Sequence, residues 1–465
     1  MLKILKDRTS NVLFFLMFGI LCLLNANYAI LRSARNALTV TDLGGGAGSI
    51  PWYELCGTMP GAVLMTLGLT WLLNRMSILR VFFIVLAAFV GFFLVFAIGI
   101  YPYLPAWKGV LQACAWMPKG MATLLPQIAS LLFFTMAELW KVALLTVLFW
   151  GFVNQYISFE RAKSFYAPLM LGGSLGTVLA GPLISLCTSD FFSGGLWSQS
   201  LLLIVLVITF ISVLTAWLFS LLAKHFAAPV PSAAPQEEPK REKLSVWESL
   251  LICLRSPFLM LLAWVTIADY IAYALGEVIF FDVLKQQFPD PRDYCNFMGQ
   301  LSLWNGILTA FSAFFITPYL LKRCRWIVAS LVTPVCILVT EGAFFIALWH
   351  PTLSTQVGLL VALGSLFFCL ARAAKYTLFD TSKEISFLLL EPLEKMQGKL
   401  VIDGMCSRLG RGGGSLVSLT LIQLFGGVLA SAPFAGALAL LIATTCVLAT
   451  SRLGHLVEER RKQQA

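Results

Sequence analysis

Long apolar segments follow one another along almost the whole chain, and short polar stretches separate them. A helix needs roughly 20 apolar residues to cross a bilayer, and about 12 segments reach that length. The alternation that a membrane β-barrel requires is not present in the sequence, so the pattern predicts an all-α membrane protein. The expected spans are 11–31, 51–73, 81–101, 124–154, 162–187, 197–222, 257–281, 297–317, 326–349, 357–376, 399–425 and 433–451.

Composition agrees with this pattern. The chain is 59% hydrophobic and 12% charged, whereas a soluble globular protein carries about 25% charged residues. A soluble enzyme is therefore excluded. The first apolar segment is longer than a signal-peptide core and lacks a small-residue cleavage site close behind it, so we expect a retained helix. A Ser-rich, acid-poor leader is not seen before it, which argues against import into a plastid or mitochondrion.

One break in composition divides the chain. The stretch 225–243 is rich in Pro, Ala and charge, which is typical of a flexible linker outside the membrane. About six spans precede it and about six follow. Two six-helix halves are typical of major-facilitator transporters, which bind substrate near the middle of the membrane. We predict an N-terminal half over 1–224, a cytoplasmic linker over 225–246, a C-terminal half over 247–451 and a cytoplasmic basic tail over 452–465.

Lys and Arg are distributed unevenly between alternate loops. In an orientation with a cytoplasmic N-terminus, few of them face outward, while both ends and the inner loops are rich in them. Positively charged loops stay cytoplasmic, so both termini are predicted inside. The formal charge of +10 is then mainly a signal of topology. We accordingly expect the lipid bilayer as a partner and expect no nucleic acid.

Metal and cofactor chemistry is not indicated by the sequence. The 11 cysteines are scattered without a Cys-x-x-Cys pair, and the three histidines form no cluster. Buried small side chains are the better interpretation of the cysteines. We predict no metal, no cofactor and no enzymatic activity, because a membrane enzyme would need a clustered nucleophile, a metal site or a cofactor motif. An anion channel is the alternative of a different class.

Ionisable residues nevertheless lie inside the apolar segments or at their ends. Each costs at least a few kcal/mol at membrane depth and persists mostly where it faces water, an ion or a polar ligand. This predicts a protein that moves a polar solute, and the excess of cations favours an anion. The residues are Glu138, Lys141, Asp269, Glu277, Arg372, Lys375, Asp403, Arg408 and Arg411.

The end of the first span carries two arginines. Arg32 and Arg35 are three residues apart and would share a helix face, with Tyr28 shortly before them. Two guanidinium groups on one face could clamp a phosphate, because each can bind two oxygens at once. The alternative is that both reach into the membrane interface.

The fourth span carries a pair of opposite charges. Glu138 and Lys141 are three residues apart and could neutralise each other, or could act as a gate that opens when substrate competes for one of them. Trp140 and Trp150 could stack on a flat base, although filling the core is their commoner role. Asn154 closes the same span.

The second half carries two further polar groups of residues. Asp269 and Glu277 are eight residues apart, about two turns, and would line one helix face. That face suits a proton site, an amine contact or a partner for an intramembrane arginine. Further along, Asp403, Arg408 and Arg411 run into glycines that let a helix or a ligand approach the backbone.

Taken in order, these groups resemble the motifs of the bacterial and plastid ATP/ADP translocase family, over roughly residues 27–415. The family's charged motif positions fall on Arg35, Glu138, Glu277 and Arg411, where both acids are kept and both family lysines are arginines. Arg keeps the charge of Lys but not its geometry. The matching runs include Asn27-Tyr28-Ala29-Ile30-Leu31-Arg32, Ala137-Glu138-Leu139-Trp140, Leu148-Phe149-Trp150-Gly151-Phe152 and Arg408-Leu409-Gly410-Arg411.

The resemblance implies a 12-helix, major-facilitator-like antiporter of the bacterial inner membrane that exchanges ATP and ADP. It is the kind of carrier by which intracellular bacteria draw on host ATP, and a monomer is expected. We predict that substrate binding involves Arg35, Glu138, Glu277, Arg411, Arg32, Arg408, Asn154 and Tyr28. We predict that coupling or gating involves Lys141, Asp269 and Asp403.

One departure from the family pattern bears on the substrate. Where the family has Trp-Lys after the seventh-span Glu, this chain has Phe280 and Phe281, followed by Asp282. Losing that lysine removes one potential phosphate contact, so import of another nucleotide or of NAD is an alternative. Proton-coupled import is a further alternative to exchange, because Glu138, Asp269 and Glu277 are candidate proton sites.

Overall fold

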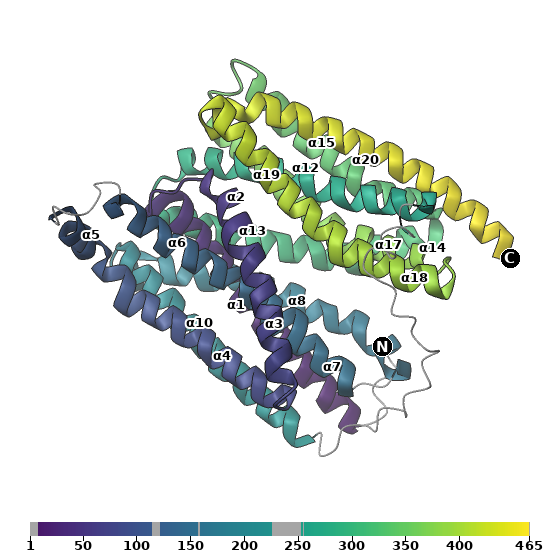
Figure 1. Ribbon diagram of the computed structural model, residues 1–465, viewed down its shortest axis with the longest axis horizontal. Helices are drawn as coiled ribbons and strands as arrows, with labels where there is room; N and C mark the ends of the chain where they lie inside the picture. The colour runs from purple at the N-terminus through teal and green to yellow at the C-terminus, as the bar shows by residue number, and fades with distance from the viewer. Residues whose placement is uncertain (1–7, 114–120, 157–158, 226–252, 254, 465) are drawn as a thin grey trace. The chain divides into compact units, whose positions relative to one another are not determined.

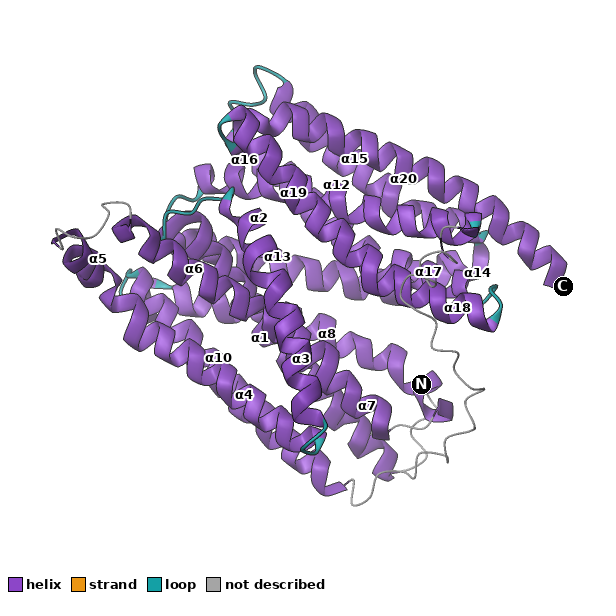
Figure 2. Ribbon diagram, viewed as in Figure 1, coloured by secondary structure: helices purple, strands orange, loops and turns teal. Residues whose placement is uncertain are grey.

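The computed structural model describes residues 8–113, 121–156, 159–225, 253 and 255–464 of the chain. All regular structure in this described part is helical (Figure 1, Figure 2). Most of it is α-helix, interrupted by short π-helical segments and one 3₁₀ turn. The predicted all-α class is confirmed.

The described residues contain 11 helical segments that are long and apolar enough to cross a membrane. Each coincides with a predicted span, and the predicted span at 399–425 is the remaining one. It is helical too, built from η9 (Leu400–Cys406) and α19 (Ser407–Phe425), but its arginines and glycines lower its hydropathy. The 11 segments are Asn11–Asp42, Ser49–Leu73, Ile78–Lys108, Leu124–Asn154, Pro168–Thr188, Trp197–Lys224, Pro257–Gln287, Pro291–Arg323, Trp326–Trp349, Val357–Phe387 and Val428–Lys462.

The chain divides into two compact units. Each holds most of one predicted half, while 50–55 and 288–307 belong to the unit of the opposite half. The predicted boundaries of the halves and the tail stay predictions. The linker over 225–246 lies, after its first residue, outside the described residues. Unit 1 comprises Met1–Ser49, Cys56–Gln236 and Phe288–Ile307, and unit 2 comprises Ile50–Leu55, Glu237–Gln287 and Leu308–Ala465.

Unit 1 is organised around its first helix. α1 (Arg8–Ala37) packs against α6 (Met121–Trp140), α8 (Phe159–Thr188) and α10 (Trp197–His225). A Cβ atom at Gly176 of α8 would lie 2.0 Å from an α1 carbonyl oxygen, so only glycine permits this approach. The other segments are η2 (Leu38–Asp42), α3 (Met59–Leu73), α4 (Ile78–Val95), η4 (Phe96–Ile100), η5 (Tyr101–Tyr103), α5 (Leu104–Ala113), η6 (Lys141–Phe149), α7 (Trp150–Tyr156), α9 (Asp190–Ser193) and most of α13 (Pro291–Phe311).

Unit 2 repeats this plan around α12 (Pro257–Gln287), which packs against α16 (Val357–Ala374), α19 and α20 (Val428–Gln464). Glycine again allows a close contact, because a Cβ atom at Gly414 of α19 would lie 2.8 Å from the Cβ of Ala274. The other segments, assigned wholly or in part to unit 2, are α2 (Ser49–Tyr53), η3 (Glu54–Thr58), η7 (Ser312–Ile316), α14 (Thr317–Arg323), α15 (Trp326–Trp349), η8 (Lys375–Phe379), α17 (Asp380–Phe387) and α18 (Pro392–Lys399).

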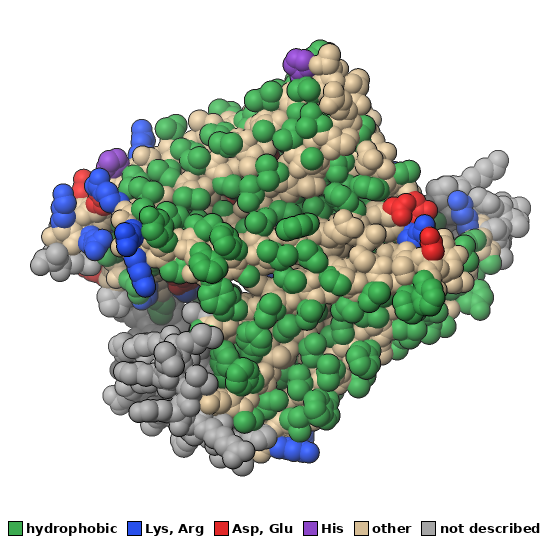
Figure 3. All heavy atoms as spheres, turned by 180° about the vertical axis from the view of Figure 1, so that it is seen from behind, with side chains coloured by type: hydrophobic (Ala, Val, Ile, Leu, Met, Phe, Trp, Pro, Cys, Tyr) green, Lys and Arg blue, Asp and Glu red, His purple; other side chains and the backbone are tan. Residues whose placement is uncertain are grey.

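Large apolar side chains are exposed along the spans. Leu64, Phe210 and Leu424 are 69%, 70% and 71% exposed, respectively. Figure 3 shows one face on which such hydrophobic side chains lie along the helices. Apolar surface on this scale is unusual for a soluble protein and suits contact with lipid tails.

Candidate functional site

A buried ion pair joins α1 to α6 inside unit 1. Arg35 Nη1 lies 2.5 Å from Glu138 Oε1, and the Tyr28 hydroxyl donates a hydrogen bond of 3.0 Å to the same oxygen. The Arg35 guanidinium also stacks over the ring of Phe134, 4.1 Å from its centre. We call these four residues the first ion-pair cluster.

Helical spacing explains how two helices supply this cluster. Tyr28 and Arg35 are seven residues apart on α1, about two turns, so they lie on one face. Phe134 and Glu138 are four residues apart on α6 and are neighbours on its surface. Arg35 is 7% exposed and Glu138 is 6% exposed, so each charge depends on the other for compensation.

Lys141 lies at the edge of this cluster. It begins the π-helical segment η6, directly after α6, and its ammonium lies 5.6 Å from the centre of the Tyr28 ring. The sequence suggested Glu138 and Lys141 as partners within one helix. The structure shows an ion pair of Glu138 with Arg35, which reaches it from a different helix.

The remaining residues predicted for unit 1 differ in their placement. Arg32 is half-buried on α1, close enough to Tyr28 for its charge to act on the hydroxyl. Asn154 is exposed on α7. Sixteen residues of helix separate Asn154 from Glu138, which is roughly 24 Å at the rise of an α-helix. The structure therefore groups Arg32, but not Asn154, with the first ion-pair cluster.

Unit 2 contains a corresponding set of residues between α12 and α16. Arg372 Nη2 lies 2.9 Å from Glu277 Oε1, and Arg372 Nε donates to the Tyr273 hydroxyl at 2.5 Å. The guanidinium lies 4.3 Å from the centre of the Phe368 ring. We call these four residues the second ion-pair cluster.

A second buried ion pair joins α12 to η8, the segment that directly follows α16. Lys375, the first residue of η8, donates a hydrogen bond to Asp269 Oδ2, and the two residues are 8% and 3% exposed. The Lys375 ammonium also lies 3.3 Å from the centre of the Tyr270 ring. Asp269, predicted for coupling, therefore has a cation partner at membrane depth.

Charged residues of α19 and η9 lie near this pair or beyond it. The Arg411 guanidinium lies 5.6 Å from the centre of the Tyr270 ring, so this ring has two cations beside it. Asp403 pairs with Lys383 at 2.7 Å. Arg408 is exposed. The structure thus brings Arg411 toward the Asp269–Lys375 pair and leaves Arg408 at the surface.

Sequence reasoning recognised Arg372 and Lys375 as intramembrane charges but gave them no role in the site. The structure shows that they pair with Glu277 and Asp269, two residues that were assigned roles. The sequence did contain a signal for this pairing. Two cations lie in the tenth span and two acids lie in the seventh, so ion pairs between these two spans could have been expected. Choosing between partners required knowing that α16 packs on α12.

Phe280 and Phe281, which depart from the expected family pattern, lie next to the second ion-pair cluster. Phe280 is 0% exposed and Phe281 is 2% exposed. Both rings pack on Phe368, with ring centres 5.7 Å and 5.9 Å apart. The Phe368 ring also lies beside the Arg372 guanidinium. An apolar packing group therefore occupies the place where the family resemblance predicts a tryptophan and a lysine.

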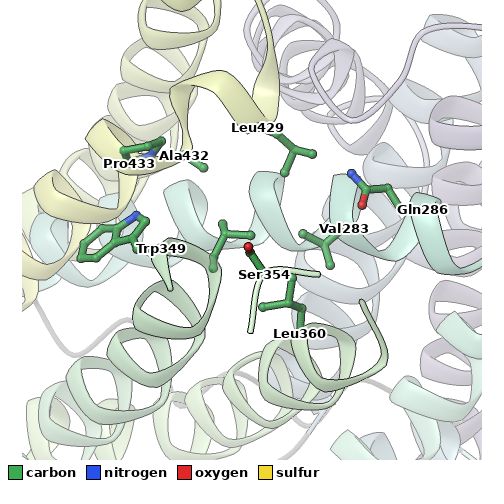
Figure 4. A pocket seen from close by; sticks show the side chains of 9 residues that line it. Val283, Gln286, Trp349, Ser354, Leu360, Leu429, Ala432 and Pro433 are labelled. Carbon is green, nitrogen blue, oxygen red and sulfur yellow. The ribbon is translucent and has the colours of Figure 1, made fainter. Parts of the chain in front are cut away.

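Unit 2 also contains a separate cavity of about 220 Å³ (Figure 4). Its lining is uncharged and includes none of the ion-pair residues, so it does not offer the charged donors that a phosphate requires. In the part of the chain that the structure describes, no group of three or more His, Cys, Asp or Glu side chains could hold a metal ion. The cavity is lined by Val283, Gln286, Leu348, Trp349, Ser354, Leu360, Leu429, Ala432 and Pro433.

Solved structures share this architecture. The chain matches the nucleoside transporter NupG with a TM-score of 0.60 at 14% identity, over 95% of this chain and 99% of that one. It matches a bacterial homologue of the human lysosomal transporter Spinster with a TM-score of 0.55 at 14% identity, over 98% of each chain. At this level of identity the match shows the fold alone, which is major-facilitator-like.

Sequence relatives are more specific. Residues 6–456 match the family described as TLC ATP/ADP transporter. The chain is 33% identical to ADP,ATP carrier protein 1 of Chlamydia trachomatis serovar D, over 90% of this chain and 83% of the relative. It is 32% identical to the chloroplastic ADP,ATP carrier protein 1 of Arabidopsis thaliana, over 94% and 73%. The chain therefore belongs to the TLC ATP/ADP transporter family, and it is a multi-pass membrane transporter rather than an enzyme.

Proposed function

We propose that this protein exchanges ATP and ADP across a bacterial inner membrane. Family membership and the printed activities of its relatives support nucleotide transport. The single observation that carries the proposal is that each unit holds a largely shielded arginine–glutamate pair, with a tyrosine hydroxyl bonded to one of its members. Charged pairs inside membrane spans are rare, and they mark the pathways of substrates or ions.

A phosphate group can compete with each glutamate for its arginine. Carboxylate and phosphate both accept two hydrogen bonds from a guanidinium, so one can replace the other without a change in geometry. Removing the cation from a buried carboxylate is costly. Glu138 has Lys141 one turn away on its own helix, and we infer that it turns to this lysine when phosphate takes Arg35.

Unit 2 offers the same exchange of partners. Arg372 and Lys375 are three residues apart and share a helix face, so Glu277 and Asp269 can share one cation while the other binds phosphate. Arg411, beside Tyr270, supplies further positive charge. We assign substrate binding to Arg35, Arg372 and Arg411, and partner exchange to Glu138, Lys141, Asp269, Glu277 and Lys375.

The test is uptake of labelled ATP into cells that express the chain, with and without preloaded ADP. We expect uptake to depend on internal nucleotide and to be unaffected by a protonophore. Protonophore-sensitive uptake without internal nucleotide would replace exchange by proton-coupled import. Flux that is independent of both, and does not saturate with ATP, would indicate a channel.

A second candidate is transport of nucleotides with fewer phosphate charges, such as ADP, a monophosphate or NAD. The observation in its favour is that Phe281 packs on Phe368 where the family carries a lysine. Unit 2 then has one cation fewer for a triphosphate. Competition of unlabelled ATP, ADP, AMP and NAD against labelled ADP separates the two candidates, because strict ATP/ADP exchange predicts no competition by AMP or NAD.

A further inference from the structure

An acid that belongs to neither ion-pair cluster lies in the middle of α15. Glu341 is the one charged residue of this helix, and it is 0% exposed. Among the residues that the structure describes, neither of its carboxylate oxygens has a hydrogen-bond partner. Asp269 and Glu277, by contrast, each have a cation partner.

The surroundings of Glu341 are apolar. Its Oε1 lies only 2.5 Å from the position that a Cβ atom would take at Gly276 of α12, so glycine makes the space for the carboxyl group. The edge of the Phe367 ring borders the same space. On the α20 side, the sequence from Val428 to Ser451 contains no charged residue. The carboxyl group is therefore shielded from solvent and has no hydrogen-bond partner among the described residues.

Charged groups on the neighbouring helices are already engaged. Gly276 is seven residues from Asp269, about two turns, so both lie on the α12 face toward Glu341, and the charge of Asp269 acts on it. The titratable and charged groups at the level of Glu341 on the elements packed against α15 include Asp269, Glu277, Arg372, Lys375, Asp380, Lys383 and, on α20, Cys446.

Charge balance follows from this arrangement. Arg372 and Lys375 compensate Glu277 and Asp269, while Lys383 pairs with Asp380 and Asp403. An ionised Glu341 would add an uncompensated negative charge in a dry site, at a cost of several kcal/mol. One bound proton removes that charge.

We propose that Glu341 is a proton-binding site, occupied in the arrangement described, and that nucleotide binding and proton binding at this site strengthen each other. The coupling rests on the proposed nucleotide function. A phosphate that takes Arg372 leaves Lys375 as the cation for both Glu277 and Asp269, so the negative charge beside Glu341 increases and a proton on Glu341 then relieves repulsion. By thermodynamic reciprocity the protonated form binds nucleotide more tightly.

Occupancy is tested by infrared spectroscopy of the purified protein. The C=O stretch of a protonated carboxyl group is distinct from the bands of a carboxylate. We expect the spectrum of wild type to contain this band at neutral pH and the difference spectrum against Glu341→Gln to show its loss. The matched control is Glu384→Gln, which removes an exposed acid paired with Lys399 and leaves the band unchanged. An unchanged band in Glu341→Gln overturns the site.

Coupling is tested by measuring ADP affinity over a range of pH. As pH rises and Glu341 releases its proton, ADP binding by wild type should weaken by up to about tenfold per pH unit, the limit for one linked proton. Glu341→Gln imitates the protonated side chain, so its affinity should be high and independent of pH. Equal pH dependence in both proteins, or none in wild type, overturns the coupling.

These outcomes are distinct from failure of the proposed function. If wild type binds no ADP or other nucleotide at any pH, the nucleotide function itself fails, whatever the infrared result. If ADP binds but the two proteins behave alike, only the role of Glu341 fails. A folded Glu341→Gln protein is expected, because glutamine has the same shape and adds no charge.

Discussion

The two ion-pair clusters use the same four residue types with the charges exchanged between helices. In unit 1 the arginine lies on α1 and the glutamate on the later helix α6. In unit 2 the glutamate lies on α12 and the arginine on the later helix α16. A tyrosine hydroxyl and a phenylalanine ring contact the pair in both.

Their surroundings differ. The side chains of Arg35 and Glu138 are 8% and 7% exposed, whereas those of Arg372 and Glu277 are 13% and 21% exposed. Unit 2 also has the Asp269–Lys375 pair, and the additional acid Glu341 lies on the neighbouring helix α15. A drier pair loses more when one partner is removed. We therefore expect unit 1 to be the less tolerant of substitution.

The largest effect is expected for Arg35→Ala. It breaks the ion pair with Glu138 in a dry site, which should destabilise the protein by about 3–5 kcal/mol and abolish ATP uptake. Arg35→Lys should retain partial uptake. The measurements are labelled-ATP uptake and thermal unfolding of the purified protein. The matched control is Arg325→Ala, which breaks an exposed pair with Glu458 and should change stability by about 1 kcal/mol or less.

A double variant separates folding from transport in unit 1. Arg35→Glu combined with Glu138→Arg gives this cluster the charge order of unit 2. Stability should recover relative to either single change, while uptake should stay low because the guanidinium then lies on the wrong helix. Full uptake by the double variant would show that the helix that carries the arginine does not matter.

Arg372→Ala should have the next largest effect. Glu277 is partly exposed and can turn to Lys375, so the loss of stability should be smaller, about 2 kcal/mol. Uptake should fall strongly, because a phosphate contact is lost. Arg323→Ala, an exposed cation at the end of α14, is the control for a change of net charge. Near-normal uptake by Arg372→Ala would remove Arg372 from the substrate site.

Phe281→Lys tests whether the aromatic departure in unit 2 changes the substrate. At an effective dielectric of about 20, a charge near 8 Å contributes roughly 2 kcal/mol, or some 30-fold in affinity. We expect the ratio of ATP to ADP affinity to rise by up to that factor. Phe281→Met, which keeps the site apolar, is the control. If ATP already competes best in wild type and the lysine changes nothing, Phe281 serves packing alone.

The smallest effects are expected for the two tyrosines. Tyr28→Phe and Tyr273→Phe each remove one hydroxyl and keep the ring. Each hydrogen bond contributes about 1 kcal/mol. Nucleotide affinity should therefore fall by about fivefold, or the free energy of unfolding by about 1 kcal/mol. Tyr28→Phe should be the more damaging, because its acceptor Glu138 is the drier carboxylate. An equal response would mean that burial does not distinguish the clusters.

Much of the fold followed from the apolar segments, because membrane-spanning helices are set by length and composition. Arg35 and Glu138 were both singled out from the sequence as candidate substrate residues. Their pairing was not predicted, since it depends on how α1 and α6 pack. Glu341 was overlooked, although a lone acid in the apolar segment 326–349 is visible in the sequence. Asn154 was predicted for the substrate site but is exposed near the end of α7. Its position relative to the cluster could not be judged from a sequence motif alone.

The π-helical segments η6 and η8 each begin at the lysine that follows a charged cluster, Lys141 in unit 1 and Lys375 in unit 2. A π-helical turn contains one residue more than an α-helical turn. That surplus residue can pass along a helix without unfolding it, and each step turns the intervening side chains by about 100° about the axis. Both lysine-bearing helices thus contain an extra residue whose movement along the helix can rotate a charged side chain from one partner to another. The span itself stays in place during this movement.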